Sequence, residues 1–364
     1  MASVARRPDG RWRARYRDAD GREHARSFDR KLDADRWAAA QRVAVDTGRH
    51  VNPRAGRETL HAYATRWLAV QAHHRAGTRE SYGRILQRLD ALHNRPRASI
   101  RRSDVQGLVA DLSSRYQPRT VRVSFAVLRA VLNAAMDDGL IATSPCTRVT
   151  LPEIVREQLV PLTPGQVRLL ADTITPRYRA LVLLAGGTGL RLGEALGLTL
   201  DRVDWLRRSV KVDRQLVGRP PTFGPVKCSS SVRVVPAPTF VLDELSAHLR
   251  RWPAGPGGLI FTSSSGGPVS RAGLETAWKT AVRDLGGVVG EPTFHGLRHA
   301  FASVLIDGGE SVTVVASRLG HANPSETLRT YSHLFPDSDE RTRSVIDNAF
   351  SEDHADSVRT SRRG

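Results

Sequence analysis

Residues 295–333 read HGLRHAFASVLIDGGESVTVVASRLGHANPSETLRTYSH, and this stretch decides the interpretation of the chain. His295 and Arg298 lie three residues apart, so both point the same way from a helix start. His321 follows a short predicted helix that a glycine closes, and Tyr331 comes ten residues later. A lone tyrosine usually belongs to a core. Together, however, these imidazoles, the guanidinium and the phenol suit a phosphodiester, whose charge a cation can balance and whose phosphorus a phenol can attack.

Two further cations lie upstream of this stretch. Arg191, in TGLRLGE, follows a glycine-rich turn and opens a predicted helix, and a helix N-terminus attracts anions. Glu194 lies on the same helical face and can orient the guanidinium, although a surface arginine paired with Glu194 is the plainer alternative. The turn lacks the Gly-Lys-Ser/Thr ending of a nucleotide-binding loop. Lys227, in GPVKCSSSVRVVP, is predicted on a hairpin between strands near 203–214 and 231–236, where a solvated lysine is the alternative.

A metal site is the competing interpretation of HGLRH. His295 and His299 have the i, i+4 spacing of a zinc-binding helix. The motif lacks the glutamate of HExxH, and Arg298 between the two histidines would repel a cation. We therefore expect no metal ligand here and no cofactor. A helix-capping role is the alternative for His299.

Taken together, HGLRH, LGHANP and TLRTYSH resemble the signature of the tyrosine recombinase (phage integrase) family, and the resemblance extends from about residue 57 to 335. It implies a mixed α/β, mainly helical catalytic domain that is shared with type IB topoisomerases. Lys227, with Arg233 and Pro236 after it, resembles the hairpin that presents the catalytic lysine of this family. Cys228 departs from the usual threonine.

The resemblance implies roles for all six residues. Tyr331 attacks the scissile phosphate, leaving a 3′-phosphotyrosyl link and a free 5′-hydroxyl. Arg191 and Arg298 balance the charge of the non-bridging oxygens, and Lys227 protonates the 5′-oxygen. His295 accepts or positions the tyrosine proton. The remaining assignments are a hydrogen bond from His321 to the phosphate and supporting positions for Glu194, His299 and His333.

Composition independently favours a nucleic-acid partner. The 364 residues carry 55 Lys+Arg against 37 Asp+Glu, a net charge of +18, which suits a polyanion. Only four of these cations are lysines, so a lysine at 227 hints at a need for a releasable proton. The two cysteines, Cys146 and Cys228, predict no disulfide framework and fit a reducing cytoplasm, with the protein at the nucleoid. No apolar run predicts a membrane helix or a signal peptide.

The domain organisation is predicted to be multidomain. Residues 1–52 predict a small β-sheet plus helix module that binds arm-type DNA sites, with Asp20-Gly21 as a hairpin turn and Asp33 as a helix cap. The strand GRWRARYRD has Trp12, Ala14 and Tyr16 on one face and arginines on the other. A β-ribbon in a DNA groove and a merely solvated arginine face are equally good interpretations of that pattern.

Residues 57–140 predict an all-α domain of four helices that resembles the core-binding (SAM-like) domain of integrases. Thr59, Thr78 and Ser103 are candidate caps, and Gly139 is a candidate helix end. The linker is predicted at 141–160, the catalytic domain at 161–345, and a disordered tail at 346–364. The catalytic helices are expected near 164–174, 176–186, 238–250, 270–285, 294–307, 311–319 and 325–331, with one more opening at Arg191.

The resemblance also implies partners. Double-stranded DNA with attachment-type sites is the substrate, and the protein works as a homotetramer on synapsed DNA. An excision factor or a DNA-bending protein is a possible further partner. Val345, Ile346 and Phe350 form an apolar patch that could dock on a neighbouring protomer or pack on its own domain. Two alternatives remain open: a type IB topoisomerase, and a DNA-binding regulator whose site is vestigial.

Overall fold

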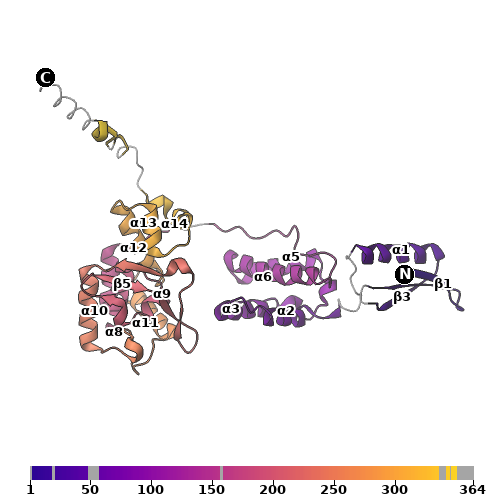
Figure 1. Ribbon diagram of the computed structural model, residues 1–364, viewed down its shortest axis with the longest axis horizontal. Coiled ribbons are helices and arrows are strands. Elements are labelled where there is room, and N and C mark those ends of the chain that lie inside the picture. Colours follow the sequence, from indigo (N-terminus) through magenta and orange to yellow (C-terminus); the bar gives the residue numbers. More distant parts are fainter. Residues whose placement is uncertain are drawn as a thin grey trace, which may run out of the picture. The chain divides into compact units, whose positions relative to one another are not determined.

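The computed structural model describes residues 2–18, 21–47, 57–155, 159–335, 342–344 and 346–350. The chain divides into two compact units, Met1–Arg156 and Glu157–Gly364 (Figure 1). Buried apolar side chains form three separate clusters, two in the first unit and one in the second. Helices predominate, and the strands form small antiparallel sheets.

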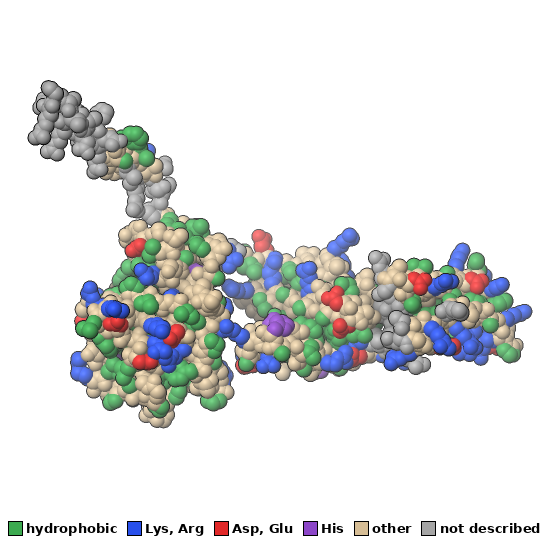
Figure 2. Space-filling model, viewed as in Figure 1, with side chains coloured by type: hydrophobic (Ala, Val, Ile, Leu, Met, Phe, Trp, Pro, Cys, Tyr) green, Lys and Arg blue, Asp and Glu red, His purple; other side chains and the backbone are tan. Residues whose placement is uncertain are grey.

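The N-terminal module is a three-stranded antiparallel sheet in the order β1-β2-β3, with one helix packed on it. Ala14 and Tyr16 of the central strand are buried, as the alternating sequence predicts. The first strand was not predicted, because ASVAR contains a single strand-favouring side chain. Figure 2 shows lysine and arginine side chains scattered over the visible surface of this module. The elements are β1 (Ala2–Arg6), β2 (Trp12–Arg17), β3 (Glu23–Phe28) and α1 (Lys31–Asp46).

Local signals in this module were only partly right. Gly21 has the positive φ of a turn residue, +78°, while Asp20 lies outside the described residues. The prediction that Asp33 caps the helix was wrong. Arg30 occupies the N-cap position without a side-chain bond, and Asp33 lies in the first turn, where its charge still favours the helix dipole.

The helical region contains the predicted helices with different boundaries. Thr59 caps the first one and accepts a hydrogen bond from the Ala62 N–H at 3.2 Å. Thr78 and Ser103 were wrong as caps, since both lie inside helices that start one or two residues earlier. Gly139 adopts φ +68° just after the last helix. The second predicted helix is split in two, so the elements are α2 (Leu60–Ala69), α3 (Ala76–Gln87), α4 (Asp90–His93), α5 (Arg102–Arg115) and α6 (Pro118–Asp137).

Part of the predicted linker packs on this helical core. Ile141 and Cys146 are buried in it, and Val149 and Leu151 lie against it. The chain therefore leaves the helical core near residue 151, ten residues later than the loss of helical periodicity suggested.

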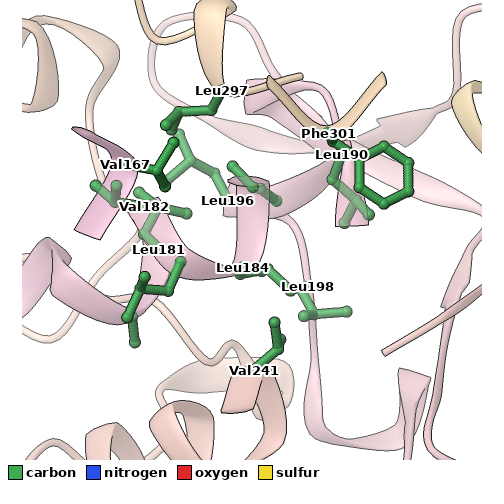
Figure 3. Packing of buried hydrophobic residues seen from close by; sticks show 14 of the residues in the cluster. Val167, Leu181, Val182, Leu184, Leu190, Leu196, Leu198, Val241, Leu297 and Phe301 are labelled. Carbon is green, nitrogen blue, oxygen red and sulfur yellow. The ribbon is translucent and has the colours of Figure 1, made fainter. Parts of the chain in front are cut away.

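The second unit is built around one helix that is apolar on nearly every side. Leu181, Val182, Leu183 and Leu184 of α8 are all buried, and the neighbouring α7, α10 and α12 pack against it (Figure 3). A helix that is apolar all round needs such a cover. The helices are α7 (Pro164–Thr173), α8 (Pro176–Thr188), α9 (Leu192–Leu196), α10 (Thr239–Arg251), α11 (Arg271–Asp284), α12 (Gly296–Asp307), α13 (Val312–Leu319) and α14 (Pro324–Tyr331).

The strands of this unit correct the prediction of one long strand near 203–214. Asp204 accepts a hydrogen bond from the Arg207 N–H at 2.8 Å, and Arg208 has φ +48°, so the chain turns back there. One sheet has the order β4-β5-β8, and a separate hairpin pairs β6 with β7. The strands are β4 (Val203–Asp204), β5 (Ser209–Val212), β6 (Arg214–Val217), β7 (Thr222–Pro225) and β8 (Arg233–Pro236).

No helix in the described ranges is long and apolar enough to cross a membrane. The apolar faces seen here instead meet one another in the three clusters.

Gly189 links the central helix to the candidate site, and it predicts a stability effect. It ends α8 at φ +65°, and a Cβ there would lie 2.4 Å from Cδ1 of Phe301. We expect Gly189→Ala to lower the free energy of unfolding by about 3 kcal/mol, because backbone strain and overpacking add. Gly266→Ala is the matched control, since Gly266 has φ +80° and no atom within 4 Å of its added Cβ. Urea denaturation should give a loss of only about 1 kcal/mol for the control; equal losses would contradict the packing argument.

Candidate active site

Arg191 occupies the N-cap position of α9, directly after the glycine-rich turn. Its Nη1 donates to Oε1 of Glu194 at 3.0 Å, and its backbone N–H donates to Oε2 at 3.0 Å. Its Nη2 donates to the carbonyl of Gly320 at 3.2 Å, and Nη1 also lies 3.3 Å from the Ser231 hydroxyl. Arg191 is therefore held from three separate segments, and the ion pair with Glu194 is part of an organised site.

Arg233 is a second arginine on the same carboxylate, and we predicted no separate role for it from the sequence. Its Nη2 lies 2.9 Å from Oε2 of Glu194, and its other nitrogens donate to the carbonyls of Arg318 and Ser231. Burial alone would raise the pKa of Glu194, but Arg233 and then Arg191 lower it below its usual value. Glu194 is thus a buried carboxylate that stays charged and joins β8 to α9.

Arg298 projects from α12 and is only 2% exposed. Its Nη1 donates to the carbonyl of Gly189 at 2.8 Å, whereas its buried Nη2 has no partner among the described residues. Burial, followed by the charges of Arg191 and Arg233, lowers the pKa of Arg298 to about 9. A buried N–H of a cation is unfavourable without an acceptor, so this guanidinium is suited to binding an anion.

Tyr331 ends α14 and is 1% exposed. Its hydroxyl oxygen lies 2.7 Å from Nδ1 of His299, within hydrogen-bond distance. Burial raises the pKa of Tyr331 to about 12, although Arg298 opposes the rise, so the phenol keeps its proton in this state. Burial, followed by His295 and Arg298, lowers the pKa of His299 to about 4, so its neutral ring can accept that proton.

The histidine on the tyrosine is therefore His299, whereas we expected His295. His295 occupies the N-cap position of α12, is exposed, and lies edge-on to the His299 ring with centroids 4.7 Å apart. The i, i+4 spacing brings the two rings into contact. Within the described residues, no three His, Cys, Asp or Glu side chains are placed to hold a metal ion.

His321 follows the left-handed Gly320 that closes α13. Its Nδ1 lies 2.8 Å from Oγ1 of Thr327, which is fully buried on α14. Burial, followed by the charge of Arg298, lowers the pKa of His321 to about 4. The ring is therefore neutral at pH 7, like that of His299.

Two predicted residues lie apart from this network. Lys227 is exposed on the loop between β7 and β8, and it forms no hydrogen bond or ion pair with the described part of the chain. The next residue, Cys228, is anchored, because its Sγ lies 3.1 Å from the Ser231 hydroxyl that also contacts Arg191. His333 donates from Nε2 to the carbonyl of Leu159 at 2.9 Å and forms no hydrogen bond with the arginines in the described part of the chain.

Comparison with known proteins identifies the family. Residues 161–337 match the model of the phage integrase family, and residues 2–47 match that of the phage integrase N-terminal domain. The tyrosine recombinase XerD of Corynebacterium glutamicum is 30% identical over 298 residues, which are 74% of this chain and 92% of XerD. The chain belongs to the phage integrase family. It is a tyrosine-type, site-specific recombinase.

Other similar proteins span nearly the whole chain. The integrase of Mycobacterium phage D29 is 25% identical over 347 residues, 90% of this chain and 91% of that protein. The Tn1549 transposon integrase, solved with a circular intermediate DNA, covers 80% of this chain and 99% of its own at 20% identity, with a TM-score of 0.69. A lambda integrase tetramer on a Holliday junction covers 89% and 96% at 18% identity, with a TM-score of 0.58. These two structures establish a shared fold.

The histidines of this recombinase predict how its stability varies with pH. Unfolded histidines ionise near pH 6.5, whereas the folded pKa values of His299 and His321 are about 4. Between those values the unfolded chain binds more protons, so the free energy of unfolding should fall as the pH drops from 6.5 to 4. Urea denaturation at pH 7 and pH 5 measures the fall. The variant carrying His299→Gln and His321→Gln should show a smaller one; an unchanged difference would contradict the assignment.

Proposed function

We propose that this recombinase cleaves and rejoins DNA at attachment-type sites through a 3′-phosphotyrosyl intermediate, and so integrates or excises a mobile element. The unpartnered Nη2 of Arg298 carries the proposal. A buried N–H that lacks an acceptor is unfavourable, and a non-bridging phosphate oxygen would satisfy it. The pKa of this guanidinium, lowered to about 9, has the same cause and would rise again beside a phosphate.

Arg191 and Arg298 supply the charge for phosphoryl transfer in this proposal. Arg191 is aligned by Glu194 and by the Gly320 carbonyl before any substrate is bound. Such fixed donors need no reorganisation as charge develops on the non-bridging oxygens. These cations supply the electrostatic stabilisation that a metal ion supplies in other phosphoryl-transfer enzymes.

Proton transfer completes the step. As the Tyr331 oxygen forms its bond to phosphorus, the phenolic proton passes to Nδ1 of His299, which already accepts it as a hydrogen bond. The bond to the 5′-oxygen breaks, and Lys227 donates a proton to that oxygen once its loop closes on the DNA. His295, whose ring touches His299, positions this base. One phosphodiester replaces another of similar energy, so the cycle needs no ATP.

The N-terminal module is proposed to bind a second class of DNA site. Arg13, Arg15 and Arg17 form a row on the face of β2 opposite its buried residues. The residues paired with Arg13 and Arg15 on the flanking strands are all small: Ser3, Ala5, Ala25 and Ser27. Small neighbours let a sheet approach a groove closely, and arginine is the commonest reader of guanine in the major groove.

Strand exchange joins two duplexes, and we propose that four copies assemble on them, as in the lambda integrase tetramer on a Holliday junction. Ile346 and Phe350 near the C-terminus are 52% and 71% exposed, which suits docking on a neighbouring protomer. Val345, the third residue of the expected patch, lies outside the described residues. A truncation after residue 336 should bind one duplex normally and fail to form a synaptic complex in gel-shift assays; normal synapsis would assign the patch to packing within one protomer.

The catalytic assignment predicts a separation of binding from chemistry. Arg191→Ala and Arg298→Ala should each lower the rate of covalent complex formation by about 10²–10³ or more while DNA is still bound. Tyr331→Phe should bind DNA and form no covalent complex. The assay uses nicked DNA that spans the element–host junctions, which traps the covalent protein–DNA complex. A denaturing gel then measures the amount of this complex.

Outcomes of the same assay separate the alternatives. Wild-type rates in either arginine variant would refute their assignment. A Tyr331→Phe protein with full biological activity would point to a regulator with a vestigial site. Relaxation of supercoiled plasmid without joining of two sites would point to topoisomerase-like activity.

The row of arginines on β2 predicts that their removal weakens only the DNA binding of the N-terminal module. Replacing Arg13 and Arg15 with glutamine should weaken binding to arm-type DNA about 10-fold or more and leave core-site cleavage unchanged. Replacing the exposed helix arginines Arg36 and Arg42 with glutamine is the control, since it removes the same charge from α1. Binding is measured by fluorescence anisotropy at fixed salt, and equal losses in the two double variants would reduce the effect to net charge.

A further inference from the structure

Two threonines of α14 use their hydroxyls differently. Thr330 is half-buried, and its Oγ1 donates to the Glu326 carbonyl at 2.9 Å, the usual bond to a residue four positions back. Thr327 is fully buried, and its Oγ1 lies 2.8 Å from Nδ1 of His321. The hydroxyl of Thr327 is thus directed out of its own helix towards a residue of the active site.

The direction of this hydrogen bond follows from the surroundings of Thr327. In the described ranges, no carbonyl or carboxylate accepts a hydrogen bond from its hydroxyl. If Nδ1 carried a proton, it would donate to Oγ1, and the hydroxyl proton would be buried without an acceptor. If Nδ1 is bare, the hydroxyl donates to it and both groups are satisfied. The second arrangement is favoured, and the lowered pKa of His321 agrees with a neutral ring.

We propose that Thr327 is a positioning residue that fixes His321 as the tautomer with its proton on Nε2. In that form the free edge of the ring is a hydrogen-bond donor, which is the form that can bind a phosphate oxygen. The other tautomer would present a bare nitrogen to the phosphate and repel it. The effect of this tautomer on DNA cleavage rests on the proposed function. The position of the proton on the His321 ring does not depend on that function.

A second hydroxyl of α14 contacts another imidazole of the site. Tyr331 lies four residues after Thr327, on the same face of α14, and its phenolic oxygen lies 2.7 Å from Nδ1 of His299. Two hydroxyls on one face of α14 therefore contact two neutral histidine rings, each at Nδ1. The packing of α14 therefore determines the hydrogen bonding of both rings.

Nitrogen-15 NMR of histidine-labelled, full-length protein at pH 7 reports which ring nitrogen carries the proton. The His321 signals are assigned by their loss in His321→Gln. In the wild type we expect a bare Nδ1 and a protonated Nε2. Thr327→Val, which keeps the shape and removes the hydroxyl, should raise the Nδ1-protonated form to a measurable fraction. Thr327→Ser should restore the wild-type signals, and Thr330→Val should leave them unchanged.

A protonated Nδ1 in the wild type would overturn the proposal, and this measurement does not depend on the folding of any Thr327 variant. Identical tautomer populations in the wild type and in folded Thr327→Val would overturn it as well. The cleavage assay then tests the link to catalysis. Thr327→Val should slow single-turnover covalent complex formation about 10-fold or more at unchanged DNA affinity, and Thr327→Ser should stay within about 3-fold of the wild type. A changed tautomer with an unchanged rate would leave the proton assignment standing and refute the phosphate-binding role of His321.

Discussion

The buried carboxylate of Glu194 is the interaction on which the rest of the site depends. Removing a carboxylate from water is unfavourable unless cations and hydrogen bonds replace its hydration. Here Arg191 and Arg233 do so from opposite sides, at 3.0 and 2.9 Å. Because Arg233 also holds the carbonyls of Arg318 and Ser231, the same carboxylate connects α9, β8 and the end of α13. Breaking either ion pair would leave a buried charge unsatisfied and release the segments that position the site.

The site carries more positive charge than this carboxylate balances. Burial is the largest cause of the lowered pKa values of Arg298, His299 and His321, and neighbouring positive charge lowers them further. Glu326 acts in the opposite direction on His321, but more weakly than burial and Arg298 do. The fold therefore maintains an unfavourable cluster of cations in the absence of substrate. In the proposed reaction, a phosphate bound in this cluster would be stabilised by groups that the fold already holds in place.

Sequence spacing was sufficient where chemistry depends on residues close together in the chain. Arg191 with Glu194, and the HGLRH and RTYSH motifs, are local patterns, and the structure brings most of their members into one network. Arg233 could not be recognised in this way, because its partners lie far away in the chain and it looks like any strand arginine. The hydrogen bond from Tyr331 to His299 likewise depends on how α12 and α14 pack. Its sequence signal, a second histidine in HGLRH, was present but did not decide between the two rings.

The prediction of secondary structure failed where single residues override the propensity of their segment. The turn between β4 and β5 depends on Arg208 at a positive φ, which arginine does not favour. Thr78 and Ser103 are not caps because their helices begin earlier in the chain. The central helix, in contrast, was predicted near 176–186 and is observed at Pro176–Thr188. Patterns that reflect burial were predicted correctly, whereas features set by one backbone angle or one distant contact were not.

The two reacting ends of the proposed step are prepared to different degrees. The phenol of Tyr331 is enclosed and already hydrogen-bonded to its base, whereas Lys227 is exposed on a loop whose following residues, Cys228 and Ser231, are tied to Arg191. A buried nucleophile reaches a phosphodiester only if α14 or its cover moves, while the lysine needs only the closure of its own loop. Both movements involve contacts with Arg191, through Ser231 on one side and the Gly320 carbonyl on the other. Arg191 therefore connects the loop of Lys227 to the segment before α14, so in the proposed reaction one guanidinium would contact the phosphate and both of the segments that move.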